Sequence, residues 1–169
     1  IECGSSRCGT SIIMAKRLLS RGLRKTVYAC DSFEGFDRDE LRRVKASSLT
    51  TAHENAFTST SYRYVQKKIA KLGVGDILVP VGGFFKDTLP HLNSAFCFAL
   101  IDCDLRDSLV YCAETLWPRL GSKGLILFDD YTDENFKGAR LGIDHFVNKY
   151  KGEIEEHGLL QRLYLVKKA

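Results

Sequence analysis

The sequence has no uninterrupted apolar stretch of the roughly 18 residues that a membrane span requires. It also shows no internal repeat and no low-complexity segment. With 169 residues, 44% of them hydrophobic and 27% charged, the chain has the length and composition of one ordinary globular domain. We therefore expect a single water-soluble domain over residues 1–169, without a membrane partner.

No dense block of basic residues occurs anywhere in the chain. The net charge is +4, the pI is about 8.7, and the lysines and arginines are spread along the sequence. A nucleic-acid-binding protein usually concentrates its positive charge on one face or in one segment. We therefore expect no nucleic-acid partner.

Cysteines are present, but no C-x-x-C pair is. Several of the six lie in apolar runs, where a free thiol behaves as a small hydrophobic group, and this favours a reducing cytoplasm. The four histidines do not approach the cysteines at the spacing of zinc ligands, so a zinc site is not favoured. The cysteines are Cys3, Cys8, Cys30, Cys97, Cys103 and Cys112.

The chain starts at Ile1 without a methionine and begins directly on a motif. This start predicts that further residues precede it in the full protein, and it leaves a targeting segment open.

Short β-rich runs alternate with stretches whose apolar residues follow helical spacing. Most of the runs are continuously apolar, as in parallel strands that are covered on both faces. This order predicts an α/β fold with a Rossmann-like, doubly wound, mostly parallel sheet, whose alternating last strand joins antiparallel. The polar segment 38–61 predicts a helix followed by a mobile loop or lid. The expected strands are residues 26–30, 77–81, 96–101, 124–128 and 159–166.

Aspartates follow three of these expected strands. Ligands of open parallel sheets bind at the carboxyl ends of the strands, so these side chains are candidates for a site. Carboxylates that converge there repel one another unless a cation neutralises them, and oxygen ligands favour magnesium or calcium over zinc. By contrast, we expect Asp107 or Ser108 to cap the next helix, which should begin near Leu109. The strand-end aspartates are Asp31, Asp102, Asp104, Asp129 and Asp130.

The opening loop, IECGSSRCGTS, places Gly4 and Gly9 before a helix. A phosphate-binding loop would need Lys where Thr10 stands, and a dinucleotide-binding loop would need glycine where Ser6 stands. A third reading is a site for S-adenosylmethionine. In that reading an acid before the first glycine takes the cofactor's amino group, and Asp31 accepts the ribose hydroxyls.

Six motifs in order make the chain resemble the macrocin O-methyltransferase family over nearly its whole length. They are ECGSSRCGTS, DSFEGF, VGGFFKDTLP, ALIDCDLRDSL, LWPRLGSKGLILFDDY and GARLGIDHF. The resemblance implies the class I methyltransferase fold, S-adenosylmethionine as cofactor and a divalent cation, usually magnesium. It also implies transfer of a methyl group to a sugar hydroxyl of an antibiotic or a related glycoside.

The resemblance also implies roles for single residues. Asp104 is implied as the general base, and Asp102 is expected beside the cofactor as well as the metal. The implied contacts are Glu2, Cys3 and Gly4 with the methionine part of the cofactor, Asp31 and Ser32 with the ribose, Gly82, Gly83 and Phe84 with the adenine, and Asp102, Asp129 and Asp130 with the metal.

The chain departs from the family pattern in three places. Arg7 and Cys8 stand where the family usually has glycine, and Arg106 stands where an aromatic residue is common. Family members also carry an N-terminal region for substrate capping and assembly that these residues do not contain, so a homo-oligomer stays open.

Two other functions stay open at this point. A catechol-type O-methyltransferase also uses a metal beside S-adenosylmethionine, but its ligand set typically ends in Asp-Asn, unlike FDDY here. A cofactor-binding module without catalysis is the alternative from a different class. Arg140 is a candidate either for holding substrate or for pairing with one of the strand-end carboxylates.

Overall fold

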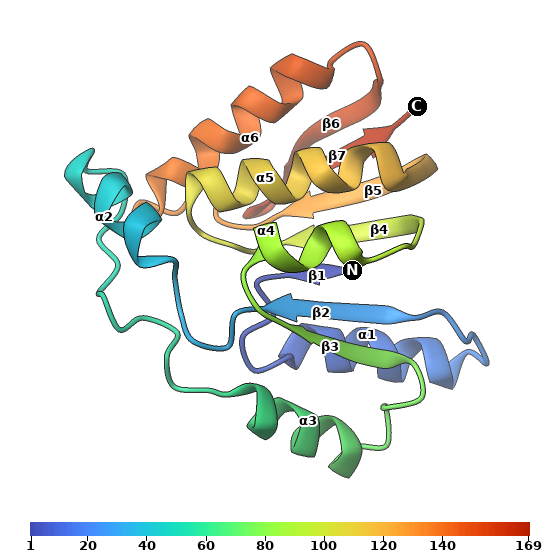
Figure 1. The fold of residues 1–169 in the computed structure, drawn as a ribbon. Helices are drawn as coiled ribbons and strands as arrows, with labels where there is room; N and C mark the ends of the chain where they lie inside the picture. Colours follow the sequence, from blue (N-terminus) through green and yellow to red (C-terminus); the bar gives the residue numbers. More distant parts are fainter.

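Seven strands form one sheet in the order β3-β2-β1-β4-β5-β7-β6, in a computed structural model that describes residues 1–169 (Figure 1). Strands β1 to β5 pair in parallel, and β7 pairs antiparallel with both β5 and β6. The predicted mostly parallel sheet with an antiparallel last strand is thereby confirmed. The strands are β1 (Glu2–Cys3), β2 (Val27–Asp31), β3 (Leu78–Gly82), β4 (Phe96–Ile101), β5 (Leu120–Phe128), β6 (Ile154–Leu160) and β7 (Leu163–Lys168).

The predicted single strand over residues 159–166 is wrong. The segment contains the end of β6, a tight turn and the start of β7, with Leu160 paired to Leu163 across the hairpin. Gln161 makes the turn with a φ of 57°, a left-handed conformation that a regular strand does not contain. The apolar residues on either side of this turn read as one run in the sequence.

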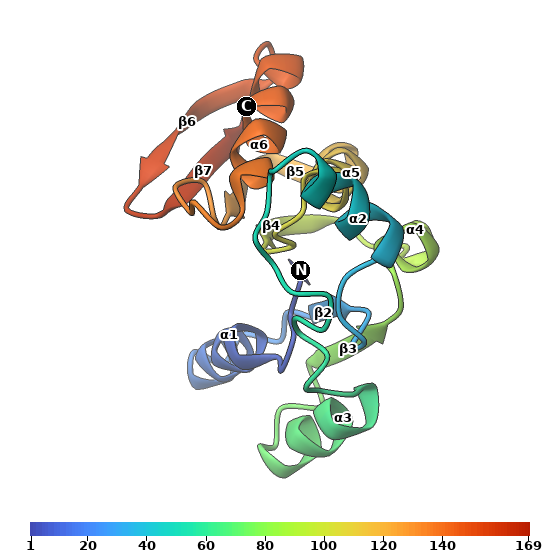
Figure 2. The same ribbon diagram turned by 90° about the vertical axis from the view of Figure 1, so that its left-hand side faces the viewer.

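Helices cover both faces of the sheet. Figure 2 shows α1 on one side of the strands and α4 and α5 on the other, while α6 packs beside α5. The polar segment 38–61 does begin with a helix, α2, which lies beyond the carboxyl ends of the parallel strands (Figure 1). The helices are α1 (Gly9–Ser20), α2 (Arg38–Ala46), α3 (Tyr62–Lys71), α4 (Phe85–Thr88), α5 (Arg106–Leu116) and α6 (Lys137–Tyr150), with 3₁₀ turns η1 (Leu89–His91) and η2 (Trp117–Arg119).

The core is divided between the two faces of the sheet. A cluster of 11 buried residues joins α1 and α3 to β2 and β3, and a cluster of 21 joins α5 and α6 to β1, β4, β5 and β7. In the larger cluster the rings of Trp117 and Phe146 meet edge to face at 5.3 Å. Packing on both faces holds the strand ends, and therefore the loops that follow them, in fixed positions.

All six cysteines are free thiols, and only Cys97 is exposed. The structure contains no helix with the length and apolar character that a membrane crossing needs.

Candidate functional site

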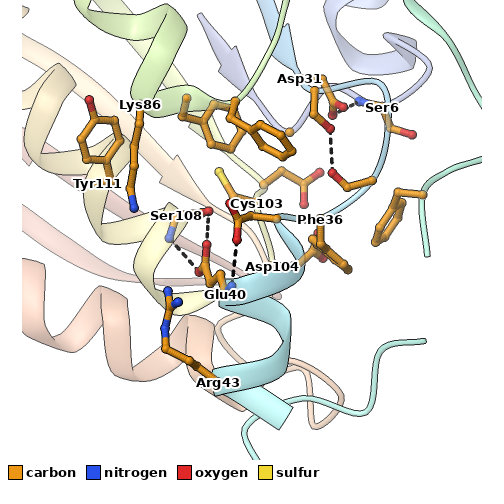
Figure 3. Close-up of a pocket in the computed structure, with 18 residues that line it drawn as sticks. Ser6, Asp31, Phe36, Glu40, Arg43, Lys86, Cys103, Asp104, Ser108 and Tyr111 are labelled. Atoms are coloured by element: carbon orange, nitrogen blue, oxygen red, sulfur yellow. Dashed lines mark hydrogen bonds between the residues drawn. The ribbon is translucent and has the colours of Figure 1, made fainter. Parts of the chain in front are cut away.

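A cleft lies at the carboxyl ends of the parallel strands, between the loops after β1, β2 and β4 and helices α2 and α4 (Figure 3). Asp102 and Asp104 line the same cleft as the opening loop. Glu2, Cys3, Gly82, Gly83, Asp129 and Asp130 do not line it. The predicted residues that line the cleft are Gly4, Asp31, Ser32, Phe84, Asp102 and Asp104.

Glycine is required at position 4 of the opening loop. Gly4 has a φ of 90°, and a Cβ atom added to it would lie 1.8 Å from the carbonyl oxygen of Asp102. The loops after β1 and β4 therefore approach more closely here than any side chain would allow. Cys8, at one of the positions where the resemblance expects glycine, has a φ of 54° and forms the N-cap of α1 through its backbone alone.

Asp31 is held by backbone donors. Its Oδ2 accepts the N–H of Ser6 at 2.8 Å, and its Oδ1 accepts the N–H of Phe33 at 2.6 Å. Burial raises the pKa of Asp31, while these two hydrogen bonds oppose the shift. The carboxylate is thus oriented before any ligand arrives, with lone pairs left for hydroxyl groups.

Glu2 is buried, with 2% of its surface exposed, and accepts a hydrogen bond from the Ser11 hydroxyl. Burial raises the pKa of Glu2 to about 6. Its implied contact with the cofactor's amino group stays a prediction, as does that of Cys3, which is fully buried.

The residues implied to contact the adenine directly precede α4 in the chain. A Cβ atom on Gly82 would lie 2.8 Å from the ring of Tyr62, so this glycine lets α3 pack on β3. Phe84 is 39% exposed and lines the cleft. The adenine roles of Gly82, Gly83 and Phe84 stay predictions.

Three aspartates meet at the edge of the cleft. Carboxylate oxygens of Asp102, Asp104 and Asp130 all lie within 4.8 Å of one another, and we call these three residues the carboxylate cluster. Asp104 and Asp130 have φ angles of 62° and 60°, a conformation that is uncommon outside glycine. Such conformations gather at functional sites, where the surrounding structure holds them in place.

The carboxylate cluster is electrostatically unfavourable as it stands. Burial, followed by the charges of Asp129 and Asp130, raises the pKa of Asp102 to about 7. Burial and a hydrogen bond with Asp130 raise the pKa of Asp104 to about 10. A divalent cation would remove this repulsion, and an all-carboxylate oxygen set fits magnesium.

Asp129 makes different contacts from the cluster beside it. Its Oδ2 pairs with Nη2 of Arg162 at 3.0 Å, and its Oδ1 accepts the N–H of Asp130 at 2.9 Å. Arg162 lies in the turn between β6 and β7, far from Asp129 in the sequence, and no motif pointed to it. The ligand role implied for Asp129 stays a prediction.

Arg140 does not join the cluster. Its guanidinium lies 4.0 Å from Asp144, one turn along α6, and 5.5 Å from the centre of the Tyr131 ring. The predicted pairing of Arg140 with a strand-end carboxylate is therefore wrong, and its role in holding substrate stays a prediction.

The predicted cap of the helix after β4 is wrong. Helix α5 begins at Arg106, and its N-cap, Leu105, offers no side-chain hydrogen bond. The backbone N–H groups of Asp107 and Ser108 donate instead to Glu40 of α2, at 2.9 Å each. Sequence reasoning missed Glu40 because its partners lie more than 60 residues away.

The site therefore combines two chemically different parts in one cleft. Asp31 and the loop around Gly4 are suited to a polar ligand with neighbouring hydroxyl groups, such as the ribose of S-adenosylmethionine. The carboxylate cluster, at the edge of the same cleft, is suited to a divalent cation.

Comparison with known proteins places the chain among methyltransferases. The family model described as Macrocin-O-methyltransferase (TylF) matches residues 1–157. The chain is 30% identical over 162 residues to 8-demethyl-8-(2,3-dimethoxy-alpha-L-rhamnosyl)-tetracenomycin-C 4'-O-methyltransferase of Streptomyces olivaceus, covering 90% of this chain and 62% of the relative. It is 28% identical to demethyldecarbamoylnovobiocin O-methyltransferase of Streptomyces niveus, covering 78% of this chain and 52% of that one.

Among solved structures, the O-methyltransferase NovP superposes with a TM-score of 0.82 at 22% identity, covering 99% of this chain and 70% of the other. This likeness supports the fold alone. The chain spans less than two thirds of the length of the two curated relatives.

Proposed function

The chain belongs to the macrocin O-methyltransferase family, and from this we propose that it is an S-adenosylmethionine-dependent O-methyltransferase. In this proposal it methylates a hydroxyl group of a sugar or of a glycosylated small molecule, with the assistance of a divalent cation, most simply Mg²⁺.

The observation that carries the proposal is the shared cleft. Asp31, oriented by two backbone N–H groups, and Asp102 and Asp104 of the carboxylate cluster line the same cavity. A cofactor held through its ribose at Asp31 would lie in the same cleft as the cluster. Methyl transfer needs this proximity, because the acceptor oxygen must approach the methyl carbon in line with the departing sulfur.

Each protein group has a defined task in this proposal. Asp31 and Ser32 hold the ribose, and Gly4, which lines the cleft, lies beside the methionine part. Asp102 and Asp130 of the carboxylate cluster, with Asp129 beside them, would hold the cation. A bound Mg²⁺ would neutralise the cluster and lower the pKa of an acceptor hydroxyl beside it. Asp104 accepts the proton of that hydroxyl, and the walls of the cleft exclude water.

The acceptor class rests on the relatives. By its printed name, the Streptomyces olivaceus relative methylates a position of a rhamnosyl tetracenomycin, so its substrate is a glycoside. Neighbouring hydroxyl groups on a sugar and on a catechol suit a divalent cation equally well, so the site geometry alone favours neither.

The test is a methyl-transfer assay. Purified protein is incubated with S-adenosylmethionine, Mg²⁺ and two acceptor panels, rhamnosides and other glycosides in one and catechols in the other. Mass spectrometry then identifies any methylated product. We expect methylated glycosides and no methylated catechols.

The possible results separate the alternatives. Methylation of catechols alone would replace the glycoside reading with the catechol one. Binding of S-adenosylmethionine without transfer to any acceptor in either panel would favour a cofactor-binding module, and absence of cofactor binding would contradict the proposal as a whole.

A further inference from the structure

Glu40 is a buried carboxylate outside the set of residues that the proposed reaction uses. Its side chain belongs to α2, and only 5% of the residue is exposed. Burying a charge is costly unless it is paired or hydrogen-bonded, so its position needs a reason. The reason is visible in the hydrogen bonds of the Glu40 carboxylate, which all go to the first turn of α5.

Glu40 supplies the cap that α5 lacks. Its Oε1 accepts the backbone N–H groups of Asp107 and Ser108, each at 2.9 Å, and its Oε2 accepts the hydroxyl of Ser108 at 2.5 Å. Figure 3 shows the Glu40 side chain pointing from α2 toward Ser108. A carboxylate in this position also interacts favourably with the positive end of the helix dipole.

Helix α2 also packs against Leu105, the residue just before α5. Leu41 and Val44 of α2 pack against Leu105, which is 1% exposed and follows directly after Asp104. Asp104 is thus followed in the chain by Leu105, which α2 packs against, and by the first turn of α5, which α2 caps. Its left-handed backbone, with a φ of 62°, is held from that side.

The segment after α2 contacts the loop that carries the other cluster member. The carbonyl oxygen of Leu49 accepts the N–H of Gly138 at 3.2 Å. Thr51 donates its N–H to the carbonyl oxygen of Asn135 at 3.1 Å and its hydroxyl to the Asn135 side chain at 3.0 Å. Residues 38–51 therefore touch both loops from which the carboxylate cluster is built.

We propose that Glu40 is a positioning residue, which holds the first turn of α5 and so keeps Asp102 and Asp104 in place for a divalent cation. Glu40 thereby connects α2, which forms one wall of the cofactor cleft, to the segment that carries Asp102 and Asp104. The part of this inference that concerns cation binding rests on the proposed function, whereas the capping of α5 does not.

The experiment compares Glu40→Gln and Glu40→Ala with a matched control on the same helix, Asp39→Asn. Asp39 is exposed and pairs only with Arg42 on the surface of α2. Amide hydrogen exchange of residues 105–109, followed by mass spectrometry, reports the α5 cap directly. Calorimetric titrations with Mg²⁺ alone and with S-adenosylmethionine alone report the two ligand sites.

We expect Glu40→Ala to speed exchange in residues 105–109 by about tenfold or more, as loss of a charge-assisted hydrogen bond does. Mg²⁺ affinity should fall by about tenfold, with Glu40→Gln between Glu40→Ala and the wild type, because its amide oxygen still accepts a hydrogen bond. Asp39→Asn should match the wild type. If Glu40→Ala does not fold, the Glu40→Gln comparison decides.

Two results would overturn the inference. One is exchange and Mg²⁺ affinity in the Glu40 variants equal to those of Asp39→Asn. The other is weaker binding of S-adenosylmethionine with unchanged exchange and Mg²⁺ affinity, because Glu40 would then contact the cofactor instead of the α5 cap. If the wild type binds neither ligand, the proposed function fails, while the exchange rates still decide whether Glu40 holds α5.

Discussion

Asp31 and the carboxylate cluster lie at the same edge of the sheet, but their surroundings differ. Asp31 accepts hydrogen bonds from two backbone N–H groups, whereas Asp102, Asp104 and Asp130 mainly face one another. The first arrangement is complete without a ligand and presents a fixed acceptor to neutral hydroxyl groups. The second carries unbalanced negative charge and becomes favourable only with added positive charge. The difference separates a site for an organic cofactor from a site for a cation.

The largest expected effect removes the proposed base and leaves the residues of the cofactor site unchanged. In Asp104→Asn, methyl transfer should fall by roughly 10²- to 10⁴-fold, the usual contribution of a general base. S-adenosylmethionine affinity should stay within about twofold of the wild type. Single-turnover kinetics with a methylated glycoside product measures the first value and calorimetry the second. Retention of the full rate would remove Asp104 from the mechanism.

The next effect concerns the cofactor side alone. Asp31→Ala removes the oriented carboxylate, so S-adenosylmethionine affinity should fall by about 30-fold, or roughly 2 kcal/mol, as for a lost hydrogen bond to a charged group. Mg²⁺ affinity should not change. The control is Asp76→Ala, at a distant loop. Equal loss of both affinities in Asp31→Ala would mean that the two parts of the cleft are not separate.

The pH dependence of stability sharpens the comparison further. Because burial and like charges raise the pKa of Asp102 to about 7 and burial raises that of Asp104 to about 10, the folded cluster holds protons that the unfolded chain releases above about pH 4. Without divalent cations, the free energy of unfolding should therefore be greatest near pH 4 and fall as the pH rises from about 4 toward 8.

Asp104→Asn tests this dependence, because an amide cannot ionise. Without divalent cations, its melting temperature should exceed that of the wild type at pH 8 by about 3 °C or more, and the gap should shrink toward pH 4. Thermal melts followed by circular dichroism at several pH values measure it. A gap that is constant with pH would show that the charge of Asp104 is not the cause.

The smallest effect concerns Arg162, whose positive charge lowers the pKa of Asp102 and of Asp130. Its side chain is 76% exposed, so solvent weakens its field. Arg162→Ala should tighten Mg²⁺ binding by only about two- to fivefold, because a competing cation is removed, and salt should reduce the effect. Calorimetry at two ionic strengths measures it, with Arg42→Ala as control. Weaker Mg²⁺ binding would show that Arg162 supports the site.

Much of the fold could be predicted because its signals are local. The apolar runs that became β2, β3, β4 and β5, and the aspartates after them, depend on neighbours in the sequence and on the rule that parallel strands end at one edge. The hairpin at Gln161 was missed because apolar residues continue on both sides of the turn. The left-handed φ at this turn belongs to a glutamine, a residue type that does not predict a turn.

The site was less predictable because several of its contacts are long-range. The pairing of Arg162 with Asp129 and the capping of α5 by Glu40 join residues 33 and 67 or more positions apart. Nothing in the spacing of charged residues distinguishes Glu40 from its exposed neighbours on α2. Only packing of the buried face of α2 on Leu105 brings the carboxylate to the helix end.

The most direct test of the two-part cleft is a calorimetric titration of Mg²⁺ into the wild type and into Asp102→Asn at pH 7.5. We expect saturable binding of one ion per chain to the wild type and no detectable binding to Asp102→Asn. S-adenosylmethionine should still bind to the wild type in the absence of the cation. Absence of saturable Mg²⁺ binding to the wild type, or unchanged binding to Asp102→Asn, would contradict the assignment of the carboxylate cluster as a cation site.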